Sequence, residues 1–375
     1  MIYFDNSATT PVHPEVFDAM LPFFKEEYGN PSSKYYTLAE NAKKAVEEAR
    51  FHIAELLKCD PDEVVFTSGA TESNNMVLKG YLDTRSGVRI ITTKTEHPSV
   101  LDTAQYLESH GVKVHYLDVD TYGFCDVDQL DTLLESDHHL KTLVSVVWGN
   151  NEIGTLNDLS TISSICAKHG VSLHTDATQV AGKVEIDLSS QVITFLSLSS
   201  HKIHGPKGIG ACIIKKDALG IRTKLTPLLH GGGQEFGYRS GTLNVHNIVG
   251  FGKAAEIAKR DLRSTMKHLA ELEQYLLQKL HEKLSGILHL NSRAATKIPG
   301  IVNIRFEGVN NELLVKKLAD HFAISTGSAC SSSKPSHVLQ SIGLTLDQVR
   351  SSVRISLSRF NTRDEIDLFI DTLTR

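Results

Sequence analysis

Short apolar runs alternate with amphipathic segments along the chain from about residue 60 onward. Runs rich in β-branched residues predict strands, and TESNNMVLKGYL (71–82) predicts a helix between the first two of them. The predicted strands are EVVFTS (63–68), VRIITT (88–93), KVHYLD (113–118), KTLVSVVWG (141–149), VSLHTDA (171–177), ITFLSLSS (193–200) and GIGACIIK (208–215). Such continuous apolar runs are typical of strands buried on both faces, as in a mainly parallel sheet covered by helices. The pattern therefore predicts an α/β fold.

The pattern changes after residue 240. Residues 241–284 keep a helical period over an unusual length, which suits a connector between domains. Beyond it, GIVNIRF (300–306) and VRISLS (353–358) predict strands, whereas NELLVKKLADH (311–321) and RDEIDLFIDTL (363–373) predict helices. We expect a second, smaller α/β domain that begins near residue 255.

The composition is that of an ordinary soluble protein. The chain has 375 residues, of which 41% are hydrophobic and 22% are charged, enough for a large domain plus a smaller one. A net charge of -5 argues against a general affinity for nucleic-acid backbones. The start, MIYFDNSATTPV, has no secretory-signal pattern, and no apolar run approaches the length of a bilayer. We expect a cytoplasmic protein with no direct nucleic-acid or membrane partner.

Five scattered cysteines without a CxxC pair argue against both a disulfide framework and a closed zinc site. Cys166 and Cys212 lie in apolar runs and are expected to fill core space, and Cys59 and Cys125 lie next to turn-like residues. Cys330 differs, because the stretch ISTGSACSSSKPSHVL surrounds it with small, flexible residues. It is the one cysteine that this pattern marks as a candidate for chemistry.

The segment TSGATES follows a predicted strand and opens a helix. Gly69 permits close approach of a ligand to the backbone, and Ala70, Thr71 and Ser73 offer donors at a positive helix terminus. This is a candidate phosphate site. The alternative is an ordinary helix cap, in which Thr71 or Ser73 satisfies the first turn.

Two further clusters follow strand ends. HTDATQ carries Asp176 and Gln179, and SLSSHKIHGPKGIGA carries a lysine, Lys202, among serines and histidines. A lysine after a buried strand loses hydration, which favours a neutral, nucleophilic amine. The alternatives are a capping acid and a surface lysine. His201 and His204 could indicate a metal, but no third ligand is near them in the sequence, so no metal is predicted.

One cofactor accounts for these clusters together. Pyridoxal phosphate requires a lysine for a Schiff base, a carboxylate beside the pyridine nitrogen and donors for its phosphate. Lys202 and Asp176 would supply the first two, and the phosphate donors would come from Ala70, Thr71, Ser199 and His201.

The chain also resembles the cysteine desulfurases, which are fold-type I pyridoxal phosphate enzymes related to the class V aminotransferases. The likeness runs from YFDNSATTP near the start to VRISLSRFNT near the end. The matching motifs are GNPSS, FTSGATESNN, TEHPSVL, NNEIGT, DATQ, SSHKIHGPKGIGA, GGGQE, RSGT and STGSAC, in the order of the family. The last of these is similar to the branch with a long, mobile cysteine loop.

The resemblance implies a large domain at 13–254 with a mainly parallel seven-stranded sheet. The small α/β domain would comprise residues 1–12 and 255–375 and carry the cysteine loop at about 324–336.

The resemblance also implies roles for individual residues. Lys202 would carry the cofactor, Asp176 would pair with its pyridine nitrogen, and His97 would stack on its ring and help to move protons. Asn151 and Gln179 would contact or hold the phenolic oxygen, whereas Ala70, Thr71, Ser199 and His201 would bind the phosphate.

Three more residues would act on the substrate or across subunits. Arg354 would clamp the substrate carboxylate, with Asn30 nearby. Thr242 would reach the cofactor phosphate of a neighbouring subunit, which implies a homodimer.

The reaction that the resemblance implies assigns a role to Cys330. As a thiolate it would attack the sulfur of L-cysteine, become a persulfide and leave L-alanine, and a flexible loop would then carry the sulfur to an acceptor protein. The alternative is an inert loop thiol. The acceptor is not identified, and iron–sulfur cluster assembly, transfer-RNA thiolation, thiamine synthesis and sulfur modification of DNA are all open.

The chain departs from the family pattern at several places. Phe236 stands where an arginine often follows GGGQE, Tyr36 and Ala39 replace a histidine and a glycine, and the segment after Cys330 is about two residues shorter. The competing functions are a selenocysteine lyase, another aminotransferase-like activity, and a non-catalytic sulfur-carrier scaffold.

Overall fold

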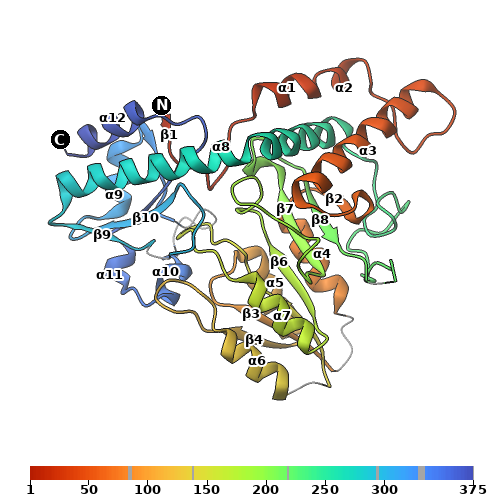
Figure 1. Ribbon diagram of the computed structural model, residues 1–375, viewed down its shortest axis with the longest axis horizontal. Coiled ribbons are helices and arrows are strands. Elements are labelled where there is room, and N and C mark those ends of the chain that lie inside the picture. Colours follow the sequence, from red (N-terminus) through yellow and green to blue (C-terminus); the bar gives the residue numbers. More distant parts are fainter. Residues whose placement is uncertain (83–86, 137–138, 218, 293–294, 328–333, 375) are drawn as a thin grey trace.

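A seven-stranded sheet forms the centre of the protein, in the strand order β2-β8-β7-β6-β5-β3-β4 (Figure 1). The computed structural model describes residues 1–82, 87–136, 139–217, 219–292, 295–327 and 334–374. The strands of this sheet are β2 (Val64–Thr67), β3 (Val88–Thr93), β4 (Lys113–Leu117), β5 (Lys141–Ser145), β6 (Ser172–Asp176), β7 (Phe195–Ser199) and β8 (Gly210–Ile214). Neighbours from β4 to β7 pair in parallel, whereas β8 is antiparallel to both β2 and β7. The predicted α/β fold with a mainly parallel sheet is confirmed.

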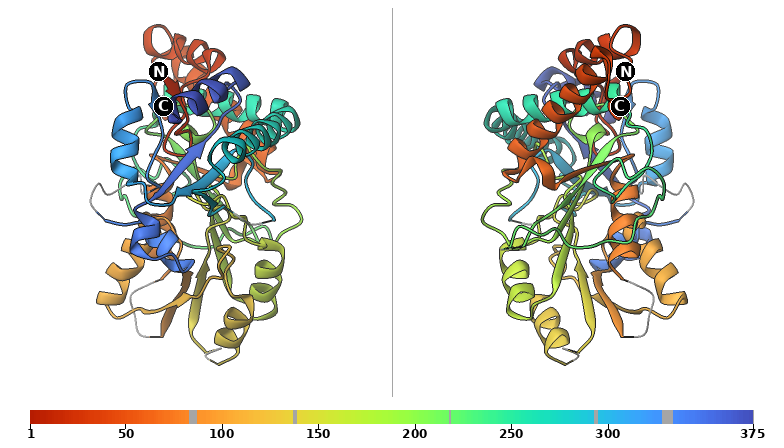
Figure 2. Two further views of the ribbon diagram at one scale, coloured as in Figure 1. Left: turned by 90° about the vertical axis from the view of Figure 1, so that its left-hand side faces the viewer. Right: turned by 90° about the vertical axis from the view of Figure 1, so that its right-hand side faces the viewer.

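Helices cover both faces of this sheet (Figure 2). They are α1 (Pro14–Met20), α2 (Pro22–Lys25), α3 (Thr37–Leu57), α4 (Ala70–Tyr81), α5 (Pro98–Ser109), α6 (Val127–Ser136), α7 (Leu159–Lys168) and the start of α8 (Val245–Leu284), with short 3-10 turns η1 (Pro61–Glu63) and η2 (Ser200–Lys202). Ile91 and Val144 pack into one hydrophobic cluster with α1, α3, α7 and α8, whereas their chain neighbours Ile90 and Leu143 pack into another with α4 and α5. Because alternate residues enter different clusters, the strands need apolar residues at every position.

Helix α8 is 40 residues long and joins two hydrophobic clusters. Its first turns, from Val245 to Ala258, pack on the large sheet, and its later residues, from Leu269 to Leu280, pack in a separate cluster with a smaller sheet. The helix therefore connects the two parts of the protein, as its length predicted.

The smaller part is built on a three-stranded antiparallel sheet in the order β12-β10-β9. Its elements are β9 (Leu288–Leu290), β10 (Ile301–Phe306), α9 (Asn311–Leu318), α10 (His337–Ser341), α11 (Leu346–Val349), β12 (Ser352–Ser356) and α12 (Arg363–Leu373). The N-terminal strand β1 (Ile2–Tyr3) pairs in parallel with β11 (Phe322–Ala323), so the first residues of the chain belong to this smaller part (Figure 1). The domain boundaries expected from the sequence stay a prediction.

Two sequence-based expectations differ in detail from the structure. The strand predicted at 141–149 is regular only to Ser145, although the Val146 and Trp148 N–H groups still donate to carbonyl oxygens of β6. The chain turns further on, where the side chain of Asn150 accepts hydrogen bonds from the N–H groups of Glu152 and Ile153. Strand β9 was not predicted, since its three residues are half-buried and carry no continuous apolar run.

No helix in the described residues is both long enough and apolar enough to cross a membrane.

The crossing of α3 and α8 depends on a glycine. A Cβ atom on Gly252 would lie 2.4 Å from Ala49 Cα, so a side chain would force the two helices apart. We expect Gly252→Ala to lower the free energy of unfolding by about 1–3 kcal/mol, because overpacking outweighs the better helix propensity of alanine. Chemical denaturation of the purified protein measures this.

Gly286 provides the matched control, because a Cβ there would meet nothing within 4 Å. Gly286→Ala is expected to change the stability by less than about 0.5 kcal/mol. Equal losses in the two variants would contradict the argument from helix packing.

Candidate active site

A cavity of about 530 Å³ lies beyond the carboxyl ends of β2, β3, β5, β6 and β7. In α/β sheets of this kind, ligands bind at that edge, where loops meet helix N-termini. Most of the residues predicted to hold a cofactor line this one cavity: Ala70, Thr71, His97, Asn151, Asp176, Gln179, Ser199, His201 and Lys202. Their convergence is decided by the parallel strands, since they come from five separate strand ends.

One end of the cavity is formed by the start of α4. Gly69 precedes the helix with φ +154°, and no side chain caps it, so the donors of the first turn at Ala70 and Thr71 remain available to an anion. Ser73 faces elsewhere, because its hydroxyl is buried and bonded to Thr67 Oγ1 at 2.8 Å. The structure favours the predicted anion site over the alternative of a side-chain cap.

Asp176 projects from the end of β6 and is held from two sides. Its Oδ2 accepts from Asn74 Nδ2 at 2.8 Å, and its Oδ1 accepts from the Thr178 backbone N–H at 2.9 Å. The residue is 5% exposed. The carboxylate therefore has a fixed direction in a nearly dry site.

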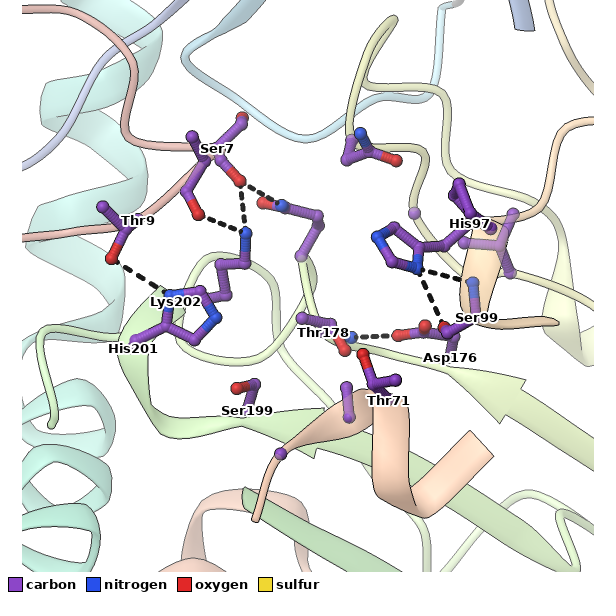
Figure 3. A pocket seen from close by; sticks show the side chains of 18 of the residues that line it. Ser7, Thr9, Thr71, His97, Ser99, Asp176, Thr178, Ser199, His201 and Lys202 are labelled. Carbon is purple, nitrogen blue, oxygen red and sulfur yellow. Dashed lines mark hydrogen bonds between the residues drawn. The ribbon is translucent and has the colours of Figure 1, made fainter. Parts of the chain in front are cut away.

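His97 caps α5 and belongs to the same network (Figure 3). Its Nδ1 accepts from the Ser99 backbone N–H at 3.1 Å and is 2.8 Å from Ser99 Oγ, which in turn accepts from Asn74. This pattern assigns the proton of the neutral ring to Nε2. Burial lowers the pKa of His97, which keeps the ring neutral at physiological pH.

Lys202 reaches across to the N-terminal segment (Figure 3). Its Nζ donates to the carbonyl oxygens of Ser7 at 2.5 Å and Ala8 at 2.8 Å. Gln179 Nε2 donates to the same Ser7 carbonyl at 2.8 Å. The first residues of the chain therefore form one wall of the cavity.

His201 lies beside Lys202 and contacts the same segment. Its Nδ1 is 3.0 Å from Thr9 Oγ1, and burial together with the Lys202 charge lowers its pKa to about 4. The ring is neutral near pH 7, so it can offer a hydrogen bond but no positive charge to a ligand.

Arg354 does not line the cavity but lies directly behind it. The side chain is fully buried, its Nη2 donates to Asp5 Oδ1 at 2.7 Å, and its Nη1 donates to the carbonyl oxygens of Asn151 at 3.0 Å and Gly327 at 3.4 Å. Its Nε is buried without a partner among the described residues. The guanidinium therefore keeps donor capacity that no described residue uses, at a buried position outside the cavity lining.

Glu152 touches the chain on both sides of residues 328–333. Its Oε2 accepts from Ser336 Oγ at 2.5 Å, and a Cβ on Gly327 would lie 2.9 Å from that same atom. His337 lines the cavity, and its Nε2 lies 2.8 Å from the Glu96 carbonyl oxygen. The described ends of the segment that carries Cys330 therefore meet at the cavity.

Besides Arg354, two predicted residues of the described chain do not line this cavity. Asn30 and Thr242 are exposed, and the Asn30 side chain accepts only from the Ser32 N–H among the described contacts. Cys330 lies outside the described residues.

The sequence analysis assigned no role to several residues that the structure places in the cavity, including Ser7, Thr9, Ser99, Glu152, Thr178 and His337. The motif YFDNSATTP was a signal for the first two, but the contacts of Ser7 with Lys202 and of Thr9 with His201 span more than 190 residues of sequence and follow only from the fold. Thr178 Oγ1 is buried with no partner in the described part of the chain, which leaves its hydroxyl for a ligand.

The fold and this cavity define a class of protein. A lysine, a carboxylate, a flat neutral histidine and an uncapped helix terminus around one pocket match what pyridoxal phosphate requires. The family model for class-V aminotransferases matches residues 2–369.

Individual proteins similar to this chain indicate which members of the class it resembles. The chain is 43% identical over 380 aligned residues to the cysteine desulfurase IscS of Klebsiella pneumoniae subsp. pneumoniae, covering 100% of this chain and 92% of that protein. Among solved structures, a NifS-like protein is 35% identical with a TM-score of 0.91, covering 100% of this chain and 98% of the other. A structure described as SspA in complex with cysteine is 35% identical with a TM-score of 0.83, covering 96% and 100%.

The chain belongs to the class-V aminotransferases and, within them, to the cysteine desulfurase family. Its cofactor is pyridoxal 5′-phosphate. The residues present fit this group: Gly69 leaves backbone donors open at the phosphate end, and a Cβ on Gly210 would lie 2.7 Å from Gly69 Cα, so the cradle needs glycine at both positions.

A buried carboxyl group next to His97 generates a prediction about pH. Glu96 is 1% exposed, and its Oε1 accepts from Thr93 Oγ1 and the Val147 N–H. Its Oε2 has no partner among the described residues. Burial, with a smaller contribution from Asp176, raises the pKa of Glu96 to about 8.

We expect Glu96→Gln to become more stabilising, relative to the native protein, as the pH rises. Between about pH 4.5 and 8 the folded protein keeps the Glu96 proton and the unfolded chain does not, so native stability falls by about 1.4 kcal/mol per pH unit from this group. Glutamine keeps the acceptor and never ionises. Denaturant unfolding at pH 5, 7 and 9 measures the difference.

Glu63→Gln is the control. Glu63 is equally buried but pairs with Lys215 Nζ at 2.7 Å, so its replacement is expected to destabilise the protein. If the free energy of unfolding of Glu96→Gln differed from that of the native protein by the same amount at every pH in this range, the assigned ionisation of Glu96 would be wrong.

Proposed function

We propose that this protein converts L-cysteine to L-alanine and transfers the sulfur to Cys330 as a persulfide, which then passes it to an acceptor protein. The observation that carries the proposal is the cavity in which Lys202, Asp176, His97 and the start of α4 meet. The family of the chain and the printed description of one solved relative, a complex with cysteine, support the choice of substrate.

Different cavity residues are proposed to hold different parts of the cofactor. Lys202 would join it covalently, and Asp176 would pair with its ring nitrogen. The remaining contacts are proposed for the ring face (His97), the phenolic oxygen (Asn151 and Gln179) and the phosphate (Ala70, Thr71, Ser199 and His201). When bound, pyridoxal phosphate supplies an electron sink for bonds broken at the substrate α and β carbons.

The protein's own groups handle the protons. Asn74 and the Thr178 N–H both donate to Asp176, so its carboxylate is stabilised as an acceptor aimed at the cavity. His97 presents a neutral ring with its proton on Nε2. Lys202 Nζ, once released, is the amine best placed to accept the substrate α-proton, because the carbonyls of Ser7 and Ala8 hold it at the cavity wall.

Arg354 is the proposed partner of the substrate carboxylate. Its guanidinium is bonded to Asp5 and to the Gly327 carbonyl, so a substrate carboxylate would take its place among these contacts. Gly327 begins the segment that leads to Cys330. The guanidinium of Arg354 would therefore contact both the substrate carboxylate and the chain that carries the thiol. Asn30 is proposed to assist, from an exposed position.

Cys330 would complete the sulfur transfer. Its thiolate forms a bond to the substrate sulfur, the substrate carbon–sulfur bond breaks, and the carbon takes a proton to give alanine. The electron pair of the broken bond stays on carbon, so no external oxidant or reductant is required. The sulfur remains on Cys330 as a persulfide.

We further propose a homodimer in which Thr242 reaches the cofactor phosphate of a second copy. Thr242 is exposed, and it lies in a segment that also exposes Leu228, Leu229 and Phe236. Exposed apolar side chains of this kind mark protein–protein contact sites.

The acceptor stays open. The relatives named IscS support a role in iron–sulfur cluster assembly, and transfer-RNA thiolation, thiamine synthesis and DNA sulfur modification remain as alternatives. The cytoplasmic location also stays a prediction. A selenocysteine lyase or aminotransferase-like activity is the competing function, and a non-catalytic sulfur carrier is the third.

Replacing Cys330 tests the persulfide step. Cys330→Ala is expected to keep the visible absorption of bound cofactor and to lose alanine formation from L-cysteine by at least about a hundredfold, because no nucleophile meets the substrate sulfur. Lys202→Ala is expected to lose both the visible absorption and the activity. Alanine assays and absorption spectra measure the two effects.

Cys59→Ala is the matched control, since burial raises the pKa of Cys59 to about 12 and leaves little thiolate. It should react like the native protein. Alanine formation at the native rate by Cys330→Ala would refute the persulfide mechanism and favour a transaminase-like activity, and a colourless native protein would favour the scaffold.

The dimer has a separate test. Light scattering is expected to give about twice the chain mass of 41.3 kDa. Thr242→Val should keep this mass and bind the cofactor about 10- to 150-fold more weakly, because a hydrogen bond to a charged phosphate is worth about 1.5–3 kcal/mol. Thr372→Val, on α12, is the control, and a monomeric native protein would exclude the shared site.

A further inference from the structure

Lys183 is a buried lysine to which the proposed reaction assigns no role. It lies in the turn after β6, four residues beyond Gln179, and is 8% exposed. Its Nζ donates to Gln179 Oε1 at 2.9 Å. Within the described residues, the charged groups that act on it are both cations, Lys202 and Arg354. A lysine buried without a compensating carboxylate is costly, and such groups concentrate at functional sites.

A continuous series of hydrogen bonds joins this lysine to Lys202. Lys183 Nζ donates to Gln179 Oε1, Gln179 Nε2 donates to the Ser7 carbonyl at 2.8 Å, and Lys202 Nζ donates to the same carbonyl at 2.5 Å. An ammonium only donates and a carbonyl only accepts, so these two partners leave the Gln179 amide a single orientation. Its nitrogen is held on the side of Ser7 and its oxygen on the side of Lys183.

Both amines also line one small space. A cavity of about 30 Å³ has Lys183 and Lys202 in its walls together with apolar residues of α8 such as Ala258 and Leu269. That volume holds about one water molecule. Lys183 is buried beside it, whereas Lys202 is half-buried and also lines the larger cavity of the candidate active site. Burial, followed by the charges of Lys202 and Arg354, lowers the pKa of Lys183 to about 7.

The other titratable groups around this space provide no counter-charge. Asp5, from the N-terminal segment, is bonded to Arg354, and Asp261, from α8, is bonded to Arg359. Burial lowers the pKa values of His201 and His204 to about 4, so both rings are neutral near pH 7. Among the described residues packed here, any positive charge on Lys183 therefore acts directly on Lys202.

We propose that Lys183 is a positioning residue for the reaction, which holds the Gln179 amide with its N–H groups toward the active cavity and opposes protonation of the nitrogen of Lys202. The inference rests on the proposed function, because it assigns Lys202 the cofactor. A second positive charge is disfavoured where one of two interacting amines is buried without a counter-charge, which is a general way of keeping an amine nucleophilic. An N–H donor on Gln179 also suits a cofactor oxygen that carries negative charge.

The test is a pH titration of the visible absorption of the purified holoenzyme. Replacing Lys183 with methionine keeps the length of the side chain but removes its charge and its donor. We expect Lys183→Met to move the midpoint of this titration upward by about one pH unit, a tenfold change in proton affinity at the Lys202 nitrogen. Lys183→Gln, which also lacks the charge, should move it in the same direction if the methionine variant does not fold.

Lys297→Met is the matched control. Burial also lowers the pKa of Lys297, but this lysine is paired with Glu273 and has no bond to Gln179. The absorption of Lys297→Met should titrate with the same midpoint as that of the native protein. An unchanged midpoint in the Lys183 variants, or an equal shift in Lys297→Met, would overturn the inference.

Different results would refute the proposed function and the role of Lys183. A native protein without visible absorption and without alanine formation would refute the proposed function itself. A coloured, active native protein whose Lys183 variants titrate unchanged would leave the function standing and remove only the role of Lys183.

Discussion

The parallel alignment of β2, β3, β5, β6 and β7 is the constraint on which the rest of this protein depends. Strands that run the same way end at the same edge, and each end here delivers polar residues into one cavity. The antiparallel strand β8 inserts between β2 and β7 without disturbing this edge, because Gly210 lets its backbone pass close to Gly69. A side chain at Gly210 would push the start of α4 out of place and open the anion site.

A second theme is the handling of charge in a dry pocket. Asp176 is aimed by Asn74 and the Thr178 N–H, and Lys202 is held by two carbonyls. Glu96 instead keeps its proton, because its second oxygen has no donor among the described residues and burial raises its pKa to about 8. The hydrogen bonds and the burial of each ionisable group thus differ, and such differences are how active sites assign different roles to their acids and bases.

The large and the smaller part of the protein meet at this pocket through polar contacts. Arg354 projects from β12 of the smaller sheet, yet it bonds to the Asn151 carbonyl of the large sheet's loops and to Asp5 of the N-terminal segment. Glu152 contacts Gly327 and Ser336 from the same loop. The long helix α8 packs in the hydrophobic clusters of both sheets, so one continuous element links the two parts that these contacts join.

The sequence by itself determined the strands, the long helix and the residues with a motif. Continuous apolar runs such as VRIITT and the helical period of 245–284 are local signals. Lys202, Asp176 and Gly69 lie in short segments, each of which indicates a chemical role without reference to the rest of the chain. Short β9 has no such signal, and neither has Lys183, which looks like a surface lysine in a turn. Ser7 lies in the motif YFDNSATTP, but nothing in the sequence shows that its carbonyl oxygen accepts a hydrogen bond from Lys202. Only tertiary structure could decide these, because burial and contacts between residues far apart in the chain arise when the strands align and the water leaves.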